Sequence, residues 1–332
     1  MTKTSGTGAR KVTRKDVARL AGVSDAVVSY TLNGGPPVAA ATAERVREAV
    51  RLLGYTPNAS ARALKLGSAR LIAVIVPDSS NPFFAALCQA VEDAARVEGY
   101  AVLVVNSEDD PSRTLSYLQS LASRQVDGVL VASVVDESQV AAFNASGVRW
   151  AMLNRSASMP DTVSVGVDLI EGARVATEHL VGHGYQNIAF IGQARPDDHR
   201  YTGWRSALRA AGLDAGPAIF SPFTREGGYA AGRELVALRN RPDAVFVSSD
   251  MMAMGVLRAF HEAGLAIPGD IAIVSFDGSP ESEYSWPPLT SLRQPVDAMG
   301  ADAVAQLIHH EPGSLSHHRF EGELVIRDSC GC

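Results

Sequence analysis

Three segments near the start of the chain repeat apolar residues at the spacing of an α-helix, so each segment has one apolar face. The faces are formed by Val17, Leu20 and Ala21, by Val27, Val28 and Leu32, and by Val46, Ala49, Val50 and Leu53. Thr13 and Ser24 are suited to begin the first and second helices, and Gly22 and Gly54 to end the first and third. The pattern predicts a bundle of three short helices.

From residue 69 onward the pattern changes to apolar runs that alternate with amphipathic segments. The run at 71–78 (LIAVIVPD) is continuously apolar before its end, as in a parallel strand covered on both faces. Repeated strand–helix pairs predict open parallel sheets. About ten such strands are too many for one sheet, which favours two lobes. The predicted fold class is α/β, with a small all-α head followed by a two-lobed parallel-sheet domain.

The first two predicted helices are joined by a turn that contains glycine, which is typical of a helix-turn-helix motif. The second helix turns Asp25, Ala26, Ser29 and Tyr30 away from the first. In this motif the second helix enters the major groove of DNA. The head is therefore predicted to bind DNA.

Charge is distributed unevenly between these two parts. The 332-residue chain has a formal net charge of −6, but residues 1–67 hold 11 Lys and Arg against four Asp and Glu. Residues 68–332 then carry a surplus of 13 negative charges. A small basic head on a large acidic body indicates a polyanion-binding module joined to a domain of another kind.

Several classes of protein are disfavoured by composition. No run of about 18 uncharged apolar residues is present, so no transmembrane helix is predicted. The basic start of the chain lacks the apolar segment of a secretory signal. Cys88, Cys330 and Cys332 do not form a disulfide framework, and we expect the last two to be reduced thiols on a loose tail. A reducing cytoplasm is the expected setting.

Enzymatic motifs are not evident. No phosphate-binding glycine loop follows a strand, and no catalytic triad or metal-ligand spacing is present. His179 and His183 are four residues apart on one predicted helix, and we interpret them as exposed helix histidines. We therefore expect that the protein is not an enzyme and that it has no catalytic residue, no bound metal and no cofactor.

Polar and aromatic residues follow the predicted strands of the acidic body. Open parallel sheets bind ligands beyond the carboxyl ends of their strands. Carboxylates and amides exchange hydrogen bonds with hydroxyl groups, and an aromatic ring covers an apolar sugar face. The pattern indicates a carbohydrate ligand, although purines and other polar metabolites use similar groups.

The head resembles the DNA-binding domain of LacI/GalR-type transcriptional repressors. The resemblance rests on VTRKDVARLAGVSDAVVSYTLNG at 12–34, on the spacing of Val38, Thr42 and Val46, and on LGYTPNASARALKLGSA at 53–69. It implies DNA contacts from Thr13, Ser24, Asp25, Ala26, Ser29, Tyr30, Asn33, Thr42, Asn58, Arg62 and Leu64. In the family, Asp25, Ala26 and Tyr30 would face bases, and residues 58–66 would form a hinge helix on the operator.

Leu64 would be the apolar wedge that enters the minor groove and kinks the DNA. The alternative for Leu64 is a small core contact. Asp25 has two interpretations, stabilisation by the helix dipole or acceptance of a hydrogen bond from cytosine. Ala39 stands where relatives often have Ser or Thr, so we expect the third helix to begin near Thr42. Tyr30 stands where many relatives have Arg.

The body resembles the periplasmic-binding-protein-like domain of the same repressors. The motifs include VPDSSNPFF at 76–84, LNRS at 153–156, VGVD at 165–168, RYTGWRSAL at 200–208 and IPGDIAIVSFDGS at 267–279. The resemblance implies effector contacts from Asp78, Asn81, Phe83, Phe84, Arg155, Asp168, Arg200, Tyr229, Ser249, Asp250, Asp277 and Gln294.

Several of these residues have simpler interpretations. Asp168 and Asp250 are suited to cap helices. Arg200 could be a solvated helix charge, and Asp277 could belong to a plain turn. We expect one of Phe83 and Phe84 to face the ligand and the other to lie in the core. Ser249 replaces an amide that is common in relatives.

The resemblance implies a domain organisation and a function. We expect a flexible tail (1–11), a DNA-binding domain (12–57), a hinge helix and linker (58–69) and an effector-binding and dimerisation domain (70–330). Lobe one would span about 70–164 and 295–322, and lobe two about 165–294 and 323–330.

The implied function is that of a repressor controlled by a sugar or sugar derivative bound between the lobes. Its partners would be double-stranded operator DNA, the effector and a second copy of the chain, without a membrane. Only three residues follow ELVIRDS at 323–329, so we expect a homodimer without a tetramerisation helix. It would be nucleoid-associated when bound to DNA. A solute-binding protein of a transporter is the alternative, but it would need export and would have no use for the head.

Overall fold

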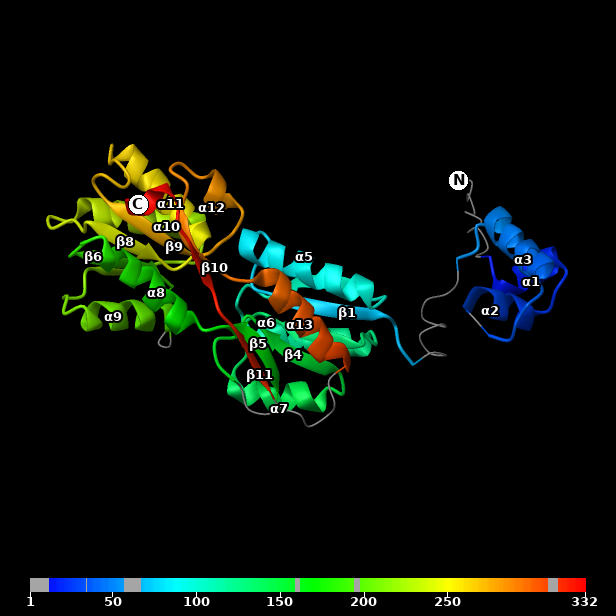
Figure 1. Cartoon of the computed structure of the whole chain (residues 1–332). Coiled ribbons are helices and arrows are strands. Elements are labelled where there is room, and N and C mark those ends of the chain that lie inside the picture. Colours follow the sequence, from blue (N-terminus) through cyan, green and yellow to red (C-terminus); the bar gives the residue numbers. More distant parts are fainter. Residues whose placement is uncertain (1–11, 34, 57–66, 159–161, 194–197, 310–315) are drawn as a thin grey trace, which may run out of the picture. The chain divides into compact units, whose positions relative to one another are not determined.

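The chain divides into two compact units, Met1–Ala69 and Arg70–Cys332 (Figure 1). The computed structural model describes residues 12–33, 35–56, 67–158, 162–193, 198–309 and 316–332. The expected basic tail and the positions of Asn58, Arg62 and Leu64 lie outside the described residues.

The first unit contains the three predicted helices, α1 (Arg14–Ala21), α2 (Asp25–Asn33) and α3 (Ala40–Leu53). Val17, Val28 and Val46 are fully buried where the helices meet, together with Ala21 and Ala49. Gly22 and Gly54 end α1 and α3 in the left-handed conformation that favours glycine. The predicted helix-turn-helix bundle is confirmed.

The start of α3 differs from the expectation. The helix begins at Ala40, and Ala39 is its N-cap without a side-chain hydrogen bond. The carbonyl group of Ala39 accepts the N–H groups of Thr42 and Ala43, each at 2.9 Å. Alanine has the strongest intrinsic helix propensity, so the Ala-rich stretch starts the helix two residues before Thr42 without a polar cap.

The second unit contains two six-stranded sheets. The first has the order β2-β1-β3-β4-β5-β11 and the second the order β7-β6-β8-β9-β10-β12, in which only β12 runs antiparallel to its neighbour. The elements of the first lobe are β1 (Leu71–Val76), α5 (Pro82–Val97), β2 (Ala101–Asn106), α6 (Pro111–Ser123), β3 (Gly128–Val131), α7 (Glu137–Ala145), β4 (Arg149–Leu153), β5 (Val163–Val167), α13 (Val296–His309) and β11 (His317–Phe320). Those of the second lobe are α8 (Leu169–Gly182), β6 (Ile188–Gly192), α9 (His199–Ala210), β7 (Ala218–Phe220), α10 (Arg225–Ala237), β8 (Ala244–Val247), α11 (Asp250–Glu262), β9 (Ala272–Asp277), α12 (Glu281–Tyr284), β10 (Thr290–Arg293), β12 (Glu323–Val325) and the 3-10 turn η1 (Asp328–Cys330).

Both sheets are covered by helices on their two faces. In β1, Ile72, Val74 and Val76 pack with α5 and α13, whereas Ala73 and Ile75 pack with α6 and α7 on the other face. Alternate residues therefore enter different cores, and this explains why the strand is continuously apolar in sequence. No helix of the described ranges is long and apolar enough to span a membrane.

The chain crosses between the lobes three times. It passes from β5 to α8, from β10 to α13, and from β11 to β12. The first crossing follows Val167, because the whole of β5 belongs to the first sheet, and this is slightly later than the expected boundary at 164. Gln294 and Pro295 form the second crossing.

The C-terminal segment is not a loose tail, contrary to the expectation from sequence. Cys330 is fully buried against the core of the second lobe. The Ser329 hydroxyl donates to the carbonyl of Ile273 at 2.7 Å and accepts the N–H of Thr290 at 2.9 Å. These bonds fix η1 to strands β9 and β10.

Candidate functional site

Three polar side chains meet at the carboxyl end of the second sheet. Arg200 lies in the first turn of α9, Asp277 ends β9, and Gln294 follows β10. An Asp277 oxygen accepts hydrogen bonds from the Arg200 guanidinium at 3.3 Å and from the Gln294 amide at 3.1 Å. The side chains of Arg200 and Asp277 are only 14% and 3% exposed. Arg200 is thus not a solvated helix charge, and Asp277 is more than part of a turn.

The backbone at Asp277 directs this arrangement. Its φ of 111° lies in a region that non-glycine residues rarely adopt. Gly278 follows with φ of 67°, where a Cβ atom would lie 2.3 Å from the Cα of Arg293. Strained backbone of this kind costs on the order of 1–3 kcal/mol and is found at functional sites. The Asp277 carboxylate is held in place by this turn.

Aromatic rings surround the Arg200 guanidinium. Its central carbon lies 4.5 Å from the ring centroid of Phe276 and 5.9 Å from that of Phe223. A partly desolvated guanidinium over a ring gains cation–π stabilisation. The rings also give this polar cluster an apolar wall.

Burial raises the pKa of Asp277 to about 7, and the nearby Asp250 carboxyl acts in the same direction. The Arg200 charge and the hydrogen bond from Gln294 oppose this shift. The carboxyl therefore gains or loses a proton readily near neutral pH.

Three buried polar atoms near the strand ends have no hydrogen-bond partner within the described residues. They are Arg200 Nε and Gln294 Oε1 in the second lobe and Asn154 Oδ1 after β4 in the first. Buried polar groups are normally paired, since an unpaired one costs about 1–3 kcal/mol. A ligand that bears both donors and acceptors could satisfy them.

Asp250 holds a second, internal network beside this cluster. Its carboxylate accepts the hydroxyls of Ser275 at 2.6 Å and Ser291 at 2.7 Å, and the N–H of Ser279 at 2.6 Å. The N-cap of α11 is Ser249, whose hydroxyl accepts the N–H of Met252 at 3.2 Å. The capping interpretation of Asp250 is therefore wrong. Burial raises the pKa of Asp250, whereas the three donors favour its charged form.

We expect replacement of Asp250 with alanine to lower the free energy of unfolding by about 3–5 kcal/mol, because three buried donors lose their acceptor. Urea denaturation of the full chain measures this effect. Asp214 is exposed, and its replacement with alanine should change stability by less than about 0.5 kcal/mol. Equal stability of the two variants would contradict a bracing role for Asp250.

The predicted residues of the first lobe make local contacts. Asp78 accepts the N–H of Ser80 at 2.8 Å and its hydroxyl at 2.9 Å. Asn81 caps α5 by accepting the N–H of Phe83 at 3.0 Å. Phe83 and Phe84 both lie in the core of the lobe, with ring centroids 5.1 Å apart. The expected division of these two rings between core and ligand is not observed.

Three other predicted residues lie apart from the Arg200–Asp277–Gln294 cluster. Asp168 caps α8 and accepts a hydrogen bond from Arg319 of β11 at 2.9 Å, so it links the two lobes. Arg155 is half-buried, and its N–H donates to Val165 at 3.1 Å. The Tyr229 hydroxyl donates to Glu262 at 2.6 Å. Glu262 ends α11, about 18 Å along the helix from Asp250, so the structure does not bring Tyr229 to the site.

Asp25 at the start of α2 forms an ion pair with Arg14 of α1 that neither interpretation of Asp25 anticipated. The Asp25 carboxylate accepts two hydrogen bonds from the Arg14 guanidinium, one of them at 2.8 Å from Nε. Arg14 holds the pKa of Asp25 below its usual range. The acid thus joins α2 to α1, and it would have to exchange this partner to contact a base.

The other predicted DNA contacts differ in exposure. Thr13 and Ser24 cap α1 and α2 as predicted, and Asp16 completes a capping box with Thr13. Ala26 and Tyr30 are exposed on α2, whereas Ser29 is only 6% exposed and does not lie on the outer face as expected. Thr42 is half-buried in the first turn of α3. The side chain of Asn33 lies outside the described residues.

Sequence reasoning missed Arg14, Phe223 and Phe276. Phe276 precedes Asp277 in β9, and strand alternation sends neighbouring residues to opposite faces. The unusual φ of Asp277 removes this alternation, so both residues reach Arg200. The ion pair could have been indicated in the sequence only by the opposite charges of Arg14 and Asp25, which are eleven residues apart.

Two family models match the chain. "Bacterial regulatory proteins, lacI family" matches residues 13–58, and "Periplasmic binding protein-like domain" matches residues 177–330. The PurR transcriptional repressor of Mannheimia succiniciproducens is 33% identical over 96% of this chain and 98% of its own. The ribose operon repressor of Escherichia coli K12 is 34% identical over 90% of this chain and 92% of its own.

Two solved structures of regulatory proteins are also similar to this chain. The lac repressor dimer bound to operator and the anti-inducer ONPF has a TM-score of 0.85 at 26% identity, over 97% of this chain and 99% of its own. A LacI family transcriptional regulator from Enterococcus faecium with bound ribose has a TM-score of 0.71 at 28% identity, over 78% of this chain and 98% of its own.

Proposed function

The chain belongs to the lacI family of bacterial regulatory proteins, and from this we propose that it is a transcriptional repressor whose affinity for operator DNA is set by a sugar-like effector between its lobes. Its relatives are repressors and not enzymes. The DNA-bound protein would lie on the nucleoid in the cytoplasm.

One observation carries the effector proposal. The cluster of Arg200, Asp277 and Gln294 combines donors and acceptors with the partly exposed Phe223 ring, and Arg200 Nε and Gln294 Oε1 have no partner among the described residues. A sugar hydroxyl can both donate to the Gln294 carbonyl oxygen and accept from the Arg200 N–H. An apolar sugar face would lie against an aromatic ring. Ribose bound to one structural relative supports this class of ligand.

The location of Gln294 suggests how ligand binding changes the affinity for DNA. Gln294 lies in the segment that crosses from β10 to α13, and Asp168 follows the crossing from β5. A ligand held by Gln294 would favour one arrangement of the lobes over another. The required coupling is modest, about 1–3 kcal/mol between the effector and operator sites.

On the DNA side, we propose that the exposed Ala26 and Tyr30 read bases and that Asp25 orients α2 through Arg14. Phosphate contacts position the helix through Thr13, Ser24 and Thr42. Asn58, Arg62 and Leu64 would complete the interface from the hinge.

We propose that the active form is a homodimer. The edge strand β2 exposes Leu103 and Val104 by 40% and 39%, and Val97 of the adjacent α5 is 84% exposed. Exposed apolar groups on an open sheet edge are typical of an interaction surface. The dimeric lac repressor structure supports the same state.

Replacement of Leu103 with lysine is expected to weaken the dimer by about tenfold or more, because it places an unpaired charge in the apolar contact. Sedimentation equilibrium at micromolar concentration measures the change. Leu238 is 36% exposed in the second lobe, and its replacement with lysine serves as the matched control. A wild-type chain that sediments as a monomer or a tetramer would contradict the proposal.

The proposed effector class is tested by thermal shift and calorimetry of the full chain against pentoses, hexoses, disaccharides and nucleosides. A sugar that binds with a defined stoichiometry and raises the melting temperature supports the proposal. If the chain binds nucleosides but none of the sugars, the proposal of a sugar-like effector is wrong.

A further inference from the structure

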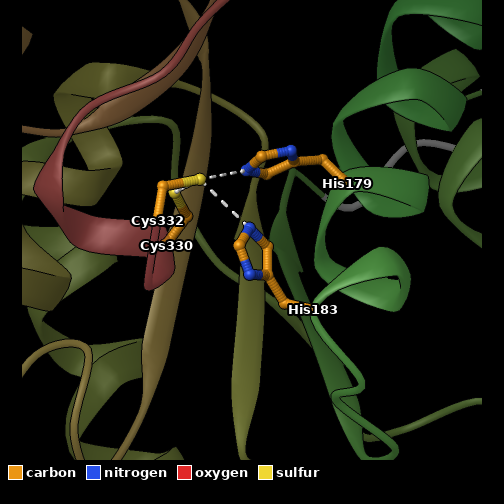
Figure 2. A group of neighbouring side chains, drawn as sticks. All are labelled: His179, His183, Cys330 and Cys332. Carbon is orange, nitrogen blue, oxygen red and sulfur yellow. Dashed lines mark hydrogen bonds between the residues drawn. The ribbon is translucent and has the colours of Figure 1, made fainter.

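Two histidines and two cysteines that are distant in sequence meet on the second lobe. Figure 2 shows His179 and His183 on one side and Cys330 and Cys332 on the other, with Cys332 facing both rings. Nε2 or Nδ1 of each histidine and Sγ of each cysteine supply one atom each, and the four atoms lie within 4.8 Å of one another. We propose that these four residues form a binding site for a zinc ion.

The distances fit tetrahedral coordination. The Sγ of Cys332 lies 3.1 Å from Nε2 of His183, 3.6 Å from Nε2 of His179 and 3.3 Å from Sγ of Cys330. In a tetrahedral zinc site, bonds of about 2.3 Å to sulfur and about 2.0–2.1 Å to nitrogen place ligand atoms about 3.4–3.8 Å apart. The three distances from Cys332 Sγ differ from these values by a few tenths of an ångström, and the other pairs lie within 4.8 Å, so shifts of up to about 1 Å would admit the ion.

The local structure directs each ligand inward. His179 in the last turn of α8 and His183 at its C-cap are four residues apart, so their rings lie on the same side of the helix, with centroids 4.7 Å apart. Gly331 has φ of 97°, and a Cβ atom there would lie 2.9 Å from the Tyr185 hydroxyl. Glycine thus lets the chain turn so that Cys332 faces the histidines.

Surrounding hydrogen bonds hold Cys330 in place. The Tyr185 hydroxyl donates to the Cys330 carbonyl at 3.2 Å, and the Thr290 hydroxyl contacts Cys330 Sγ at 3.1 Å. Partners of this kind orient ligands in metal sites. His183 and Cys332 are exposed, which leaves the ion a path from solvent.

The donor set selects the metal. Two thiolates and two imidazoles in a tetrahedron are typical of zinc, and four protein ligands leave no open position for a substrate. The site is therefore structural, and a bound ion would tie the end of the chain to α8.

The full-length chain, reduced and purified without chelator, should bind about one equivalent of Zn²⁺ and show a higher melting temperature with it. Co²⁺ substitution should give thiolate charge-transfer bands and the intense d–d bands of a tetrahedral site. Cys332→Ser and His183→Gln should each lower zinc affinity by at least about tenfold and weaken the tetrahedral d–d bands of the cobalt form, whereas only Cys332→Ser should also weaken the thiolate charge-transfer bands.

Two variants outside the cluster are matched controls. Cys88→Ser removes a thiol in the first lobe, and His261→Gln removes an exposed histidine from α11. Both should bind zinc and cobalt as the wild type does. A reduced wild-type chain that takes up no zinc, or ligand variants that bind as well as the controls, would overturn the proposal.

Discussion

Replacement of Arg200 with alanine is expected to lower effector affinity by about 100-fold, or about 3 kcal/mol, and to leave operator affinity without effector unchanged. The guanidinium is nearly buried between Asp277 and Phe276, and its Nε has no hydrogen-bond partner among the described residues. A ligand hydroxyl bound to it gains a charge-assisted hydrogen bond that alanine cannot supply. Calorimetry with the sugar that stabilises the wild type measures the loss.

The fold should survive this change. Burial already raises the pKa of Asp277 to about 7 in the presence of Arg200. Loss of a positive charge that lowers this pKa moves it higher, so the carboxyl becomes neutral at pH 7 and no isolated charge stays buried. Arg205 on the same helix is exposed, and its replacement with alanine is the matched control. Normal effector binding by the Arg200 variant would show that the effector site lies elsewhere.

Replacement of Leu64 with alanine is expected to weaken operator binding by about tenfold or more at fixed salt, because the proposed wedge would no longer stabilise a kinked minor groove. Effector affinity measured without operator should not change, since every proposed effector contact belongs to the second unit, Arg70–Cys332. Filter binding with an operator duplex measures the effect, at one ionic strength because phosphate contacts depend strongly on salt.

Leu52 provides the control for this experiment. It is 69% exposed on α3, within the head. If the Leu52→Ala and Leu64→Ala variants bind the operator equally well, Leu64 is not a wedge.

Helices and strands whose apolar residues repeat regularly could be predicted from sequence, since burial determines where those residues occur. The faces of Val17 and Val46 predicted the bundle of the head. The continuous apolar run of β1 predicted a sheet covered on both sides, and the alternate packing of Ala73 and Val74 confirms it. The predicted start of α3 near Thr42 was wrong. Backbone hydrogen bonds to the carbonyl group of Ala39 begin the helix, and no side-chain cap is needed.

The candidate site was predicted less completely, because side-chain direction depends on contacts between distant residues. Arg200 and Gln294 both donate to Asp277, and the positive φ of Asp277 is a feature that no sequence pattern indicates. Tyr229 points to the far end of α11, which its sequence position does not reveal. His183 and Cys332 are 149 residues apart, so no local spacing indicated their contact.

The central claim is that effector and operator sites are energetically coupled, and reciprocal titration tests it most directly. Operator sequences are first recovered by genomic footprinting. The operator Kd is then measured with and without saturating effector, and the effector Kd with and without operator, at one salt concentration. We predict that both change by the same factor, of about 5–150. An operator Kd that is identical with and without a bound effector would contradict the account.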